Sequence, residues 1–457
     1  MKLQHISDIS EKVRMSKQVT YLRSSRMGVV LGSFGSLCLK NPFPVQCALL
    51  LIYRATLDFM YLTQLSPLYA YSGFTQDISP LGYGLSWLLL IAFLPLIVGV
   101  QEQEDRPSSV LVTLINLLYF VPMSSYMGCK GSAFWFVASV ALYWLVFLLL
   151  QLFMPSFTLR KVPHRHSRLL FIMLTVGSIL LVMGISGVYT GFRLKLNISN
   201  VYDIRAEAAN YDIPTALSYA LSWMTIVLSI LILYWLRAKK YLVVALLIIV
   251  YLFYYSIGAH KDVFLFLFLL VACNFVYRKW MCRWVAGFLS LGVAACWLLQ
   301  AIWGFLLPMS LFVRRMMYVP VQLSEVYANY FSEHPLNLLR EGILGKLGFD
   351  PVYSYKIPKV IGEFLDKHTN ANNGMLGDMY ANLPAILGVF IFPLILVMIF
   401  RMFDMSAKSL PAHIVVGFCI FFAISFCNTT WGTTLLSGGF LLACVLLYLF
   451  PLEKGEL

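Results

Sequence analysis

The sequence predicts an all-α polytopic membrane protein, and three features lead to this prediction. Hydrophobic residues make up 60% and charged residues 12% of the 457 residues, which is far from the composition of soluble domains. About a dozen apolar runs are long enough to cross roughly 30 Å of hydrocarbon as helices. Because a helix satisfies its own backbone hydrogen bonds inside the bilayer, helices rather than a barrel are expected.

Twelve spans are expected, and they form a single integral membrane domain over residues 1–457. They lie near residues 43–66, 83–100, 109–127, 132–154, 168–190, 214–236, 240–258, 262–277, 284–307, 383–400, 411–427 and 433–450. The apolar run 27–39 is short for a crossing, so it is expected to be re-entrant or interfacial. Residues 1–26 are polar and basic without an apolar core, which predicts a cytoplasmic segment rather than a signal peptide.

Basic residues in the short connections predict the orientation of the spans. Connections 159–168, 237–240 and 277–283 are rich in Lys and Arg, and twelve crossings place them on the same side as residues 1–26. The positive-inside rule assigns that side, and both termini, to the cytoplasm. The net charge of +13 is therefore attributed to membrane insertion and to contact with anionic membrane lipids, and no nucleic-acid partner is expected.

The nine cysteines show no CxxC pairing and are expected to be small core residues. A disulfide between Cys129 and Cys427, at the outward ends of two spans, is left open by their positions.

Two outer connections are candidates for a functional site: residues 191–213 and the larger 308–382. The larger one contains an amphipathic pattern that predicts a helix closed by His334-Pro335. Its expected apolar face is Val319, Leu323, Val326, Tyr327, Tyr330 and Phe331, and its expected polar face is Gln322, Glu325, Asn329 and Ser332. Further short helices over 336–347 and 359–367 are expected to lie flat over the mouth of the membrane domain.

Missing motifs argue against several kinds of chemistry. The chain has no GxxxxGK[ST] phosphate loop and no GxGxxG after a strand, which argues against nucleotide hydrolysis. The outer connections hold no carboxylate pair at metal-binding spacing and no HxxxH cluster. Neither a bound metal nor another cofactor is expected.

Cationic side chains are instead frequent in the outer connections. The candidates for binding a diphosphate are Arg314, Arg315, Arg205, Lys261 and Arg340. Guanidinium groups bind phosphate oxygens in bidentate fashion and stabilise the charge of a departing phosphate without a metal. A lipid-linked diphosphate fits this pattern, because its headgroup lies at the interface while its tail stays in the bilayer. The alternative is that these side chains are snorkelling anchors at the membrane edge.

The most unusual stretch is HTNANNGMLGDMYANLPAILG, residues 368–388, where amides and glycines run straight into a span. The candidate sugar-binding residues are Asn370, Asn372 and Asn373, with Tyr327 and Tyr330 from the preceding helix. Asp378 is available as a carboxylate base. The alternative is a helix start whose asparagines cap the backbone.

Arg54 and Asp58 lie four residues apart inside the first span. Charged residues inside a membrane indicate a functional site unless they neutralise each other. Since both partners are present, a structural ion pair is the alternative reading.

Four segments together resemble the Wzy-like family of O-antigen or oligosaccharide repeat-unit polymerases. RRMMYVPVQLSEVYANYFSEHP resembles the start of the large loop of that family, and NANNGMLGDMYANLPAILG resembles its end. VYDIRAEAA is similar to an earlier loop, while GAHKD resembles a span tip with lysine in place of arginine. The arrangement of spans resembles the family over the whole chain, whereas the local motifs are short and degenerate.

The resemblance implies a GT-C-like, metal-independent membrane glycosyltransferase of the bacterial inner membrane with its active site facing the periplasm. Such an enzyme transfers a growing undecaprenyl-diphosphate-linked glycan onto a new lipid-linked repeat unit in polysaccharide or lipopolysaccharide biosynthesis. It implies that Arg314, Arg315 and Arg205 hold the diphosphates, with Arg340 a weaker candidate. The implied partners are the lipid-linked oligosaccharide and a chain-length regulator.

The related O-antigen ligases carry a His-Asn-x-x-Leu pattern at the end of this loop, whereas this chain reads Asn372-Asn373-Gly374-Met375-Leu376. Asparagine in place of histidine favours a polymerase and leaves the general base open. The candidates for that base are Asp378, His368, His334 and Glu333. The alternatives for the protein are an O-antigen ligase and, in another class, a transporter or flippase for lipid-linked oligosaccharides.

Overall fold

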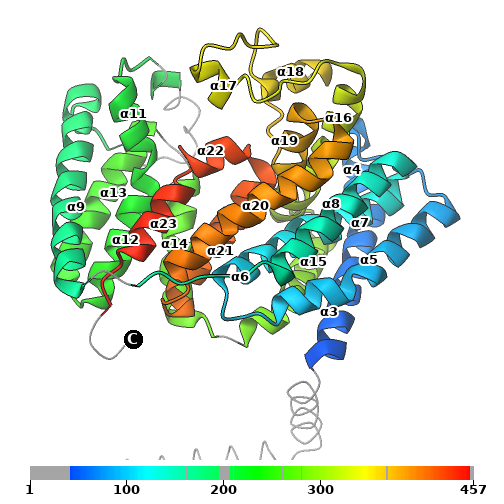
Figure 1. The fold of residues 1–457 in the computed structure, drawn as a ribbon, viewed down its shortest axis with the longest axis horizontal. Coiled ribbons are helices and arrows are strands. Elements are labelled where there is room, and N and C mark those ends of the chain that lie inside the picture. Colours follow the sequence, from blue (N-terminus) through cyan, green and yellow to red (C-terminus); the bar gives the residue numbers. More distant parts are fainter. Residues whose placement is uncertain are drawn as a thin grey trace, which may run out of the picture.

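The structure is a computed structural model that describes residues 42–160, 163–194, 206–208, 210–258, 261–278, 280–366 and 369–452. Every regular element in these ranges is a helix, as the sequence predicts. The helices form two groups that lie side by side in Figure 1. The larger group holds α3–α8, α15, α20 and α21, and the smaller holds α9, α11–α14 and α23.

The larger group surrounds one almost completely buried helical segment, Pro107–Lys130. This segment consists of α6 (Pro107–Ile115), η3 (Asn116–Phe120) and α7 (Val121–Lys130). The helices that pack on it are α3 (Pro42–Met60), α5 (Pro80–Gln101), α20 (Ala385–Ala407) and α21 (Ala412–Asn428). Helix α8 (Phe134–Phe153) packs between α5 and α20, and α15 (Met281–Trp303) packs on α3. After α3 the chain continues through η1 (Tyr61–Leu65), α4 (Ser66–Tyr69) and η2 (Ala70–Ser72).

The smaller group packs around α12 (Met224–Arg237), which contacts α9, α13, α14 and α23. Its helices are α9 (His164–Ile185) with η4 (Ser186–Thr190), α11 (Thr215–Ser222), α13 (Tyr241–Gly258), α14 (Lys261–Val276) and α23 (Phe440–Tyr448). Contacts between α14 and α21 and between α20 and α23 join the two groups. The short α22 (Trp431–Leu435) connects α21 to α23.

Nine helices in the described part are long and apolar enough to cross a membrane, and the bent pair α11–α12 raises the number to ten. Two further apolar helices are shorter: Phe266–Val276 and Ala412–Asn428. Each of the twelve expected spans falls on one of these helical segments. The chain is therefore a multi-pass helical membrane protein, while the number of crossings and the GT-C-like arrangement stay predictions.

Three of the wide π-helical turns in the chain have a proline as their local cause. A proline lies two residues after the end of each segment: Pro67 after η1, Pro122 after η3 and Pro320 after η6 (Met309–Tyr318). A proline within a helix removes one backbone N–H and its ring clashes with the carbonyl four residues earlier. In each case that carbonyl lies inside the π segment, where the wider turn accommodates the ring.

The large loop folds into short helices that cover one end of the larger group, at the top of Figure 1. These are η6, α16 (Val319–Glu333), α17 (Ile343–Lys346), α18 (Ile357–Phe364) and α19 (Met375–Asn382). The predicted apolar face of α16 is confirmed as buried or half-buried, and the helix ends at His334 as expected. Glu325 lies on the expected polar face but is not in contact with solvent, because this residue is 4% exposed and its carboxylate pairs with Lys130 of α7.

Contacts between connections define two ends of the molecule. At one end, Gln101 donates to the Cys282 carbonyl oxygen at 2.6 Å and Arg283 pairs with Glu104 at 2.8 Å. At the other end, Gln322 of α16 donates to the Ser72 carbonyl oxygen at 2.8 Å. Helix α21 has 17 residues and runs from the first end, where Ala412 lies in a cavity with Glu104, to the second, where Asn428 leads into α22. Because successive spans cross the membrane in opposite directions, their connections are expected to alternate between these two ends. Which end faces the cytoplasm stays a prediction.

The eight cysteines in the described part are free, and Cys129 and Cys427 form no disulfide. The expected segments 1–26 and 27–39 lie outside the described residues.

Candidate functional site

Asp378 lies in α19, the last helix of the large loop, and is 7% exposed. Its Oδ2 accepts a hydrogen bond from the backbone N–H of Trp431 at 2.5 Å, and no donor among the described residues reaches its Oδ1. Burial raises the pKa of the Asp378 carboxyl to about 8; the Trp431 N–H opposes this rise, and the charge of Glu341 adds to it. A carboxyl that exchanges its proton near neutral pH is suited to general acid–base chemistry.

The polar stretch before Asp378 explains how α19 reaches this position. Asn373 is 1% exposed, accepts a hydrogen bond from the Gly374 N–H at 2.8 Å and donates to the Ser324 hydroxyl of α16 at 3.2 Å. A Cβ atom on Gly374 would lie 2.1 Å from the Phe426 carbonyl oxygen, so only glycine allows α19 to approach the end of α21 this closely. Asn373 therefore bonds the backbone just before α19, whose N-cap Gly374 has no side-chain cap, while Asn370 and Asn372 are exposed.

Tyr327 and Tyr330 hold the loop together. The Tyr327 hydroxyl donates to the Ala371 carbonyl oxygen at 2.8 Å, and the side chain is 3% exposed. Tyr330 is 8% exposed and stacks on the ring of His334 with 3.9 Å between ring centroids. The Tyr327 hydrogen bond ties α16 to the segment before α19, whereas the Tyr330 stack lies at the end of α16 itself. Asn370 and Asn372 are therefore the predicted sugar contacts whose side chains are open to a ligand.

Two of the other three candidate bases, His334 and Glu333, are exposed. The Nδ1 of His334 lies 2.8 Å from the Tyr330 carbonyl oxygen. His368 lies outside the described residues. Among the candidates that the structure describes, Asp378 is therefore the one enclosed by protein.

Arg314 and Arg315 lie on η6, where the chain passes from α15 into the large loop. The Arg314 guanidinium carbon lies 4.4 Å from the centre of the Tyr69 ring, and its Nε and Nη2 lie 3.4 and 3.2 Å from the Ser310 hydroxyl. Arg315 is exposed, and neither arginine has a carboxylate partner within the described part of the chain. No described residue accepts a hydrogen bond from Arg314 Nη1, whose donors can therefore bind an anion.

The remaining predicted cations are spread out. Arg340 is half-buried in the turn that precedes α17, without a carboxylate partner among the residues described. Arg205 lies outside the described residues, as does the side chain of Lys261, the first residue of α14.

Arg54 and Asp58 form a closed ion pair. Arg54 Nε donates to Asp58 Oδ1 at 2.7 Å, and its other nitrogens reach the hydroxyls of Ser124 and Ser86 at 3.0 and 3.1 Å. The Tyr83 hydroxyl donates to Asp58 Oδ2 at 2.8 Å. Because both buried charges are paired and hydrogen-bonded, this arrangement fits the structural alternative.

The sequence did not predict a second buried ion pair, because the expected span ended at residue 400, before both residues of the pair. Arg401 of α20 is 5% exposed and donates to Asp404 Oδ2 at 2.9 Å and to the Gln151 carbonyl oxygen at 2.6 Å. Asp404 Oδ1 accepts from the backbone N–H of Ser108 at 2.8 Å and so satisfies the first turn of α6. The spacing of three residues between an Arg and an Asp at the end of an apolar run was the available signal.

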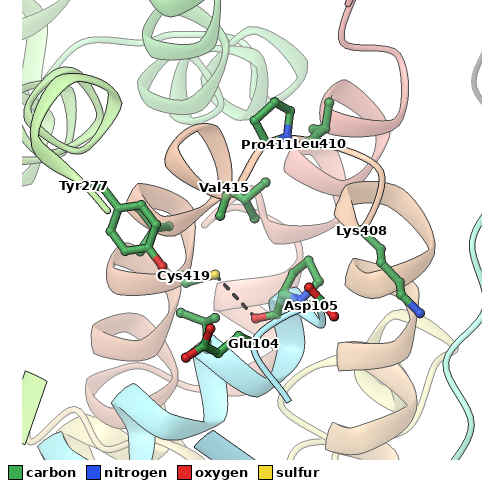
Figure 2. A pocket seen from close by; sticks show the side chains of 12 residues that line it. Glu104, Asp105, Tyr277, Lys408, Leu410, Pro411, Val415 and Cys419 are labelled. Carbon is green, nitrogen blue, oxygen red and sulfur yellow. Dashed lines mark hydrogen bonds between the residues drawn. The ribbon is translucent and has the colours of Figure 1, made fainter. Parts of the chain in front are cut away.

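A cavity of about 460 Å³ lies at the opposite end of the larger group. Glu104, Asp105, Tyr277, Lys408 and Cys419 line it together with an apolar wall from α6 and α21, as Figure 2 shows. None of the predicted site residues lies there. Within the described ranges, no group of three or more His, Cys, Asp or Glu side chains is placed to hold a metal ion.

The fold and these contacts define a multi-pass helical membrane protein with an end loop that encloses a carboxyl group and carries arginines without a carboxylate partner among the described residues. No protein-family model, no curated protein and no solved structure matches the chain.

Proposed function

We propose that this protein is a polysaccharide polymerase of the O-antigen type. It transfers a growing undecaprenyl-diphosphate-linked glycan onto a new lipid-linked repeat unit at the periplasmic face of the inner membrane. The observation that carries the proposal is that Arg314 and Arg315 lack a carboxylate partner in the described part of the chain, whereas the buried arginines Arg54 and Arg401 each have one. Unpaired guanidinium groups at the edge of an apolar domain are suited to a lipid-linked diphosphate.

The arginines act on the leaving group. As the bond between the anomeric carbon and the phosphate oxygen breaks, negative charge collects on the diphosphate. The face of the Tyr69 ring holds Arg314 in place, which leaves guanidinium N–H groups to stabilise that charge. No metal is needed for this step, and the energy of the sugar–phosphate bond drives the transfer.

Asp378 acts on the acceptor. Its free carboxylate oxygen takes the proton from the acceptor hydroxyl while the hydroxyl oxygen forms the new bond to the anomeric carbon. A pKa of about 8 supports this role, because a base is most effective when its pKa lies near the working pH. The exposed side chains of Asn370 and Asn372 are the proposed contacts of sugar hydroxyls.

The transporter alternative receives less support. A flippase would need charged groups that are free to meet a passing diphosphate within the spans. The charged side chains buried in the described helices are instead engaged with protein partners, as in Arg54 with Asp58 and Arg401 with Asp404. The resemblance of the loop segments to repeat-unit polymerases supports the same choice.

The test replaces the arginines and follows the length of surface glycan on a gel. We expect Arg314→Ala and Arg315→Ala each to lower the rate by about 10²–10³, which leaves short glycan with a single repeat. Arg165→Ala is the matched control, because it removes an exposed arginine distant in sequence from the loop and should keep the full ladder. Membrane levels of all variants are compared by immunoblot.

A complete ladder in the double variant Arg314→Ala/Arg315→Ala would refute the proposal. Deleting the gene separates the alternatives: single-repeat glycan indicates a polymerase, whereas polymer that stays on its carrier lipid indicates a ligase.

A further inference from the structure

The segment η6, which carries Arg314 and Arg315, is held at its end by a buried tyrosine. Tyr318 is the last residue of η6 and is 0% exposed. Its hydroxyl donates to the Leu57 carbonyl oxygen of α3 at 3.1 Å and lies 2.9 Å from the Ser125 hydroxyl oxygen of α7. A single side chain thus ties η6 to two helices of the larger group.

Ser125 connects this tyrosine to the buried ion pair in α3. Its hydroxyl donates to Asp58 Oδ1 at 2.5 Å, and the same oxygen accepts a hydrogen bond from Arg54 Nε at 2.7 Å. The other carboxylate oxygen, Oδ2, accepts from the Tyr83 hydroxyl of α5 at 2.8 Å. Helices α3, α5 and α7 pack against one another (Figure 1), so the hydrogen bonds run from the ion pair through α7 to the end of η6.

The packing of α7 leaves room for the ion pair. A Cβ atom on Gly128 would lie 2.2 Å from Ser86 Oγ and 3.2 Å from Arg54 Nη2, so a larger residue would displace the guanidinium. The desolvation of a buried ion pair offsets much of its attraction, and apolar side chains of similar volume often stabilise a fold as well. What the charges add is a set of hydrogen bonds with fixed directions, which hold the neighbouring side chains in place.

The wide turn of η6 transmits the position of Tyr318 to Arg314. The N–H of Val319 bonds to the Arg314 carbonyl oxygen, and Tyr318 lies inside the ring that this bond closes. Because both residues belong to one hydrogen-bonded turn, a shift of Tyr318 also moves the backbone of Arg314. At the other end of its side chain, the Arg314 guanidinium lies over the Tyr69 ring at 4.4 Å.

The apolar contacts of η6 do not restrict it in the same way. Met309, Val313 and Met317 are each 0% exposed. The burial of apolar surface is favourable but has no preferred direction, so it tolerates a small rotation or translation of the segment. A hydrogen bond weakens steeply when its distance or angle changes. The Tyr318 hydroxyl therefore supplies a directional contact at the end of η6.

We propose that Tyr318 is a positioning residue. Together with Ser125 and the Arg54–Asp58 pair, it fixes η6 so that Arg314 and Arg315 meet the diphosphate. This role rests on the proposed function, in which the two arginines bind the diphosphate of the lipid-linked substrate. Tyr318 is fully buried and so acts on the substrate only through the arginines.

The test measures the dissociation constant of farnesyl diphosphate for the purified full chain in detergent, together with the thermal midpoint. Tyr318→Phe and Ser125→Ala should each raise the dissociation constant about tenfold, because the arginines are displaced from the diphosphate. Each should lower the midpoint by only about 2 °C, as expected for the loss of one buried hydrogen bond in a chain of this size.

Tyr277→Phe is the matched control. It removes a tyrosine hydroxyl that lies 2.9 Å from Cys282 Sγ at the opposite end of the molecule, beside the cavity in Figure 2. This variant should bind farnesyl diphosphate like the native chain, because no arginine of η6 depends on that hydroxyl.

The outcomes separate this role from the proposed function. Normal binding by Tyr318→Phe and Ser125→Ala, with binding lost in Arg314→Ala/Arg315→Ala, would overturn the positioning role and leave the proposed function standing. Equal weakening in Tyr277→Phe would also overturn it, because the loss would then follow from the removal of any tyrosine hydroxyl. Normal binding by the double arginine variant would refute the proposed function itself, and the positioning role with it.

Discussion

Replacing Asp378 by Asn should change how the stability of the protein depends on pH. The ordinary pKa of 3.8 applies to the unfolded chain, whereas the folded carboxyl has a pKa of about 8. Between pH 4 and pH 8 the folded state therefore binds more protons than the unfolded state, so the free energy of unfolding falls as pH rises through this interval. The contribution of this one group is about 1.4 kcal/mol for each pH unit.

The asparagine in this variant cannot lose a proton, yet its side-chain oxygen still accepts the hydrogen bond from Trp431. The free energy of unfolding of the variant should therefore not decrease between pH 4 and pH 8, and the variant should be more stable than the native chain at pH 8. For a chain of this size the difference in thermal midpoint between the two proteins should grow by about 2 °C per pH unit. The measurement is the midpoint of both purified proteins at intervals from pH 5 to pH 8.

Asp350→Asn removes an exposed carboxyl from the same loop and serves as the control, which should follow the native profile. Parallel profiles for Asp378→Asn and the native chain would refute the reasoning. In cells, the same variant should accumulate in the membrane and fail to make long glycan, which separates its stability from its activity.

Two further predictions concern stability. Asp404→Ala should destabilise the protein by about 3–5 kcal/mol, because the buried Arg401 loses its partner, and a thermal midpoint close to that of the native chain would contradict this. Gly374→Ala should prevent accumulation of folded protein, since the new Cβ would meet the backbone of Phe426 at 2.1 Å. Gly432→Ala, where no atom lies within 4 Å of the new Cβ, should accumulate normally, and fluorescence-detected size exclusion distinguishes the two glycine variants.

Local sequence patterns predicted most of the secondary structure. Apolar runs of sufficient length become helices because the backbone has no other partners in a bilayer, and this holds for each of the twelve expected segments. The end of α16 at His334-Pro335 is likewise a local property of the chain. Pro67, Pro122 and Pro320 also fit local reasoning, since each lies just after a π-helical turn.

Contacts between distant segments decided what the polar residues do. Glu325 belongs to the polar side of α16 by its spacing, but it is buried and pairs with the half-buried Lys130 of α7. Tyr327 has a side chain suited to contact a sugar, but its hydroxyl donates a hydrogen bond to the Ala371 carbonyl oxygen.

For this protein, the sequence alone determined that the chain is a multi-pass helical membrane protein, because hydrophobicity and backbone bonding depend only on nearby residues. The tertiary structure decided which charges are satisfied. It paired Glu325 of α16 with Lys130 of α7, and it left Arg314 without a carboxylate partner in the described part of the chain. The counter-ion of Glu325 is supplied by the helix that packs opposite, and no periodicity along the chain specifies that neighbour.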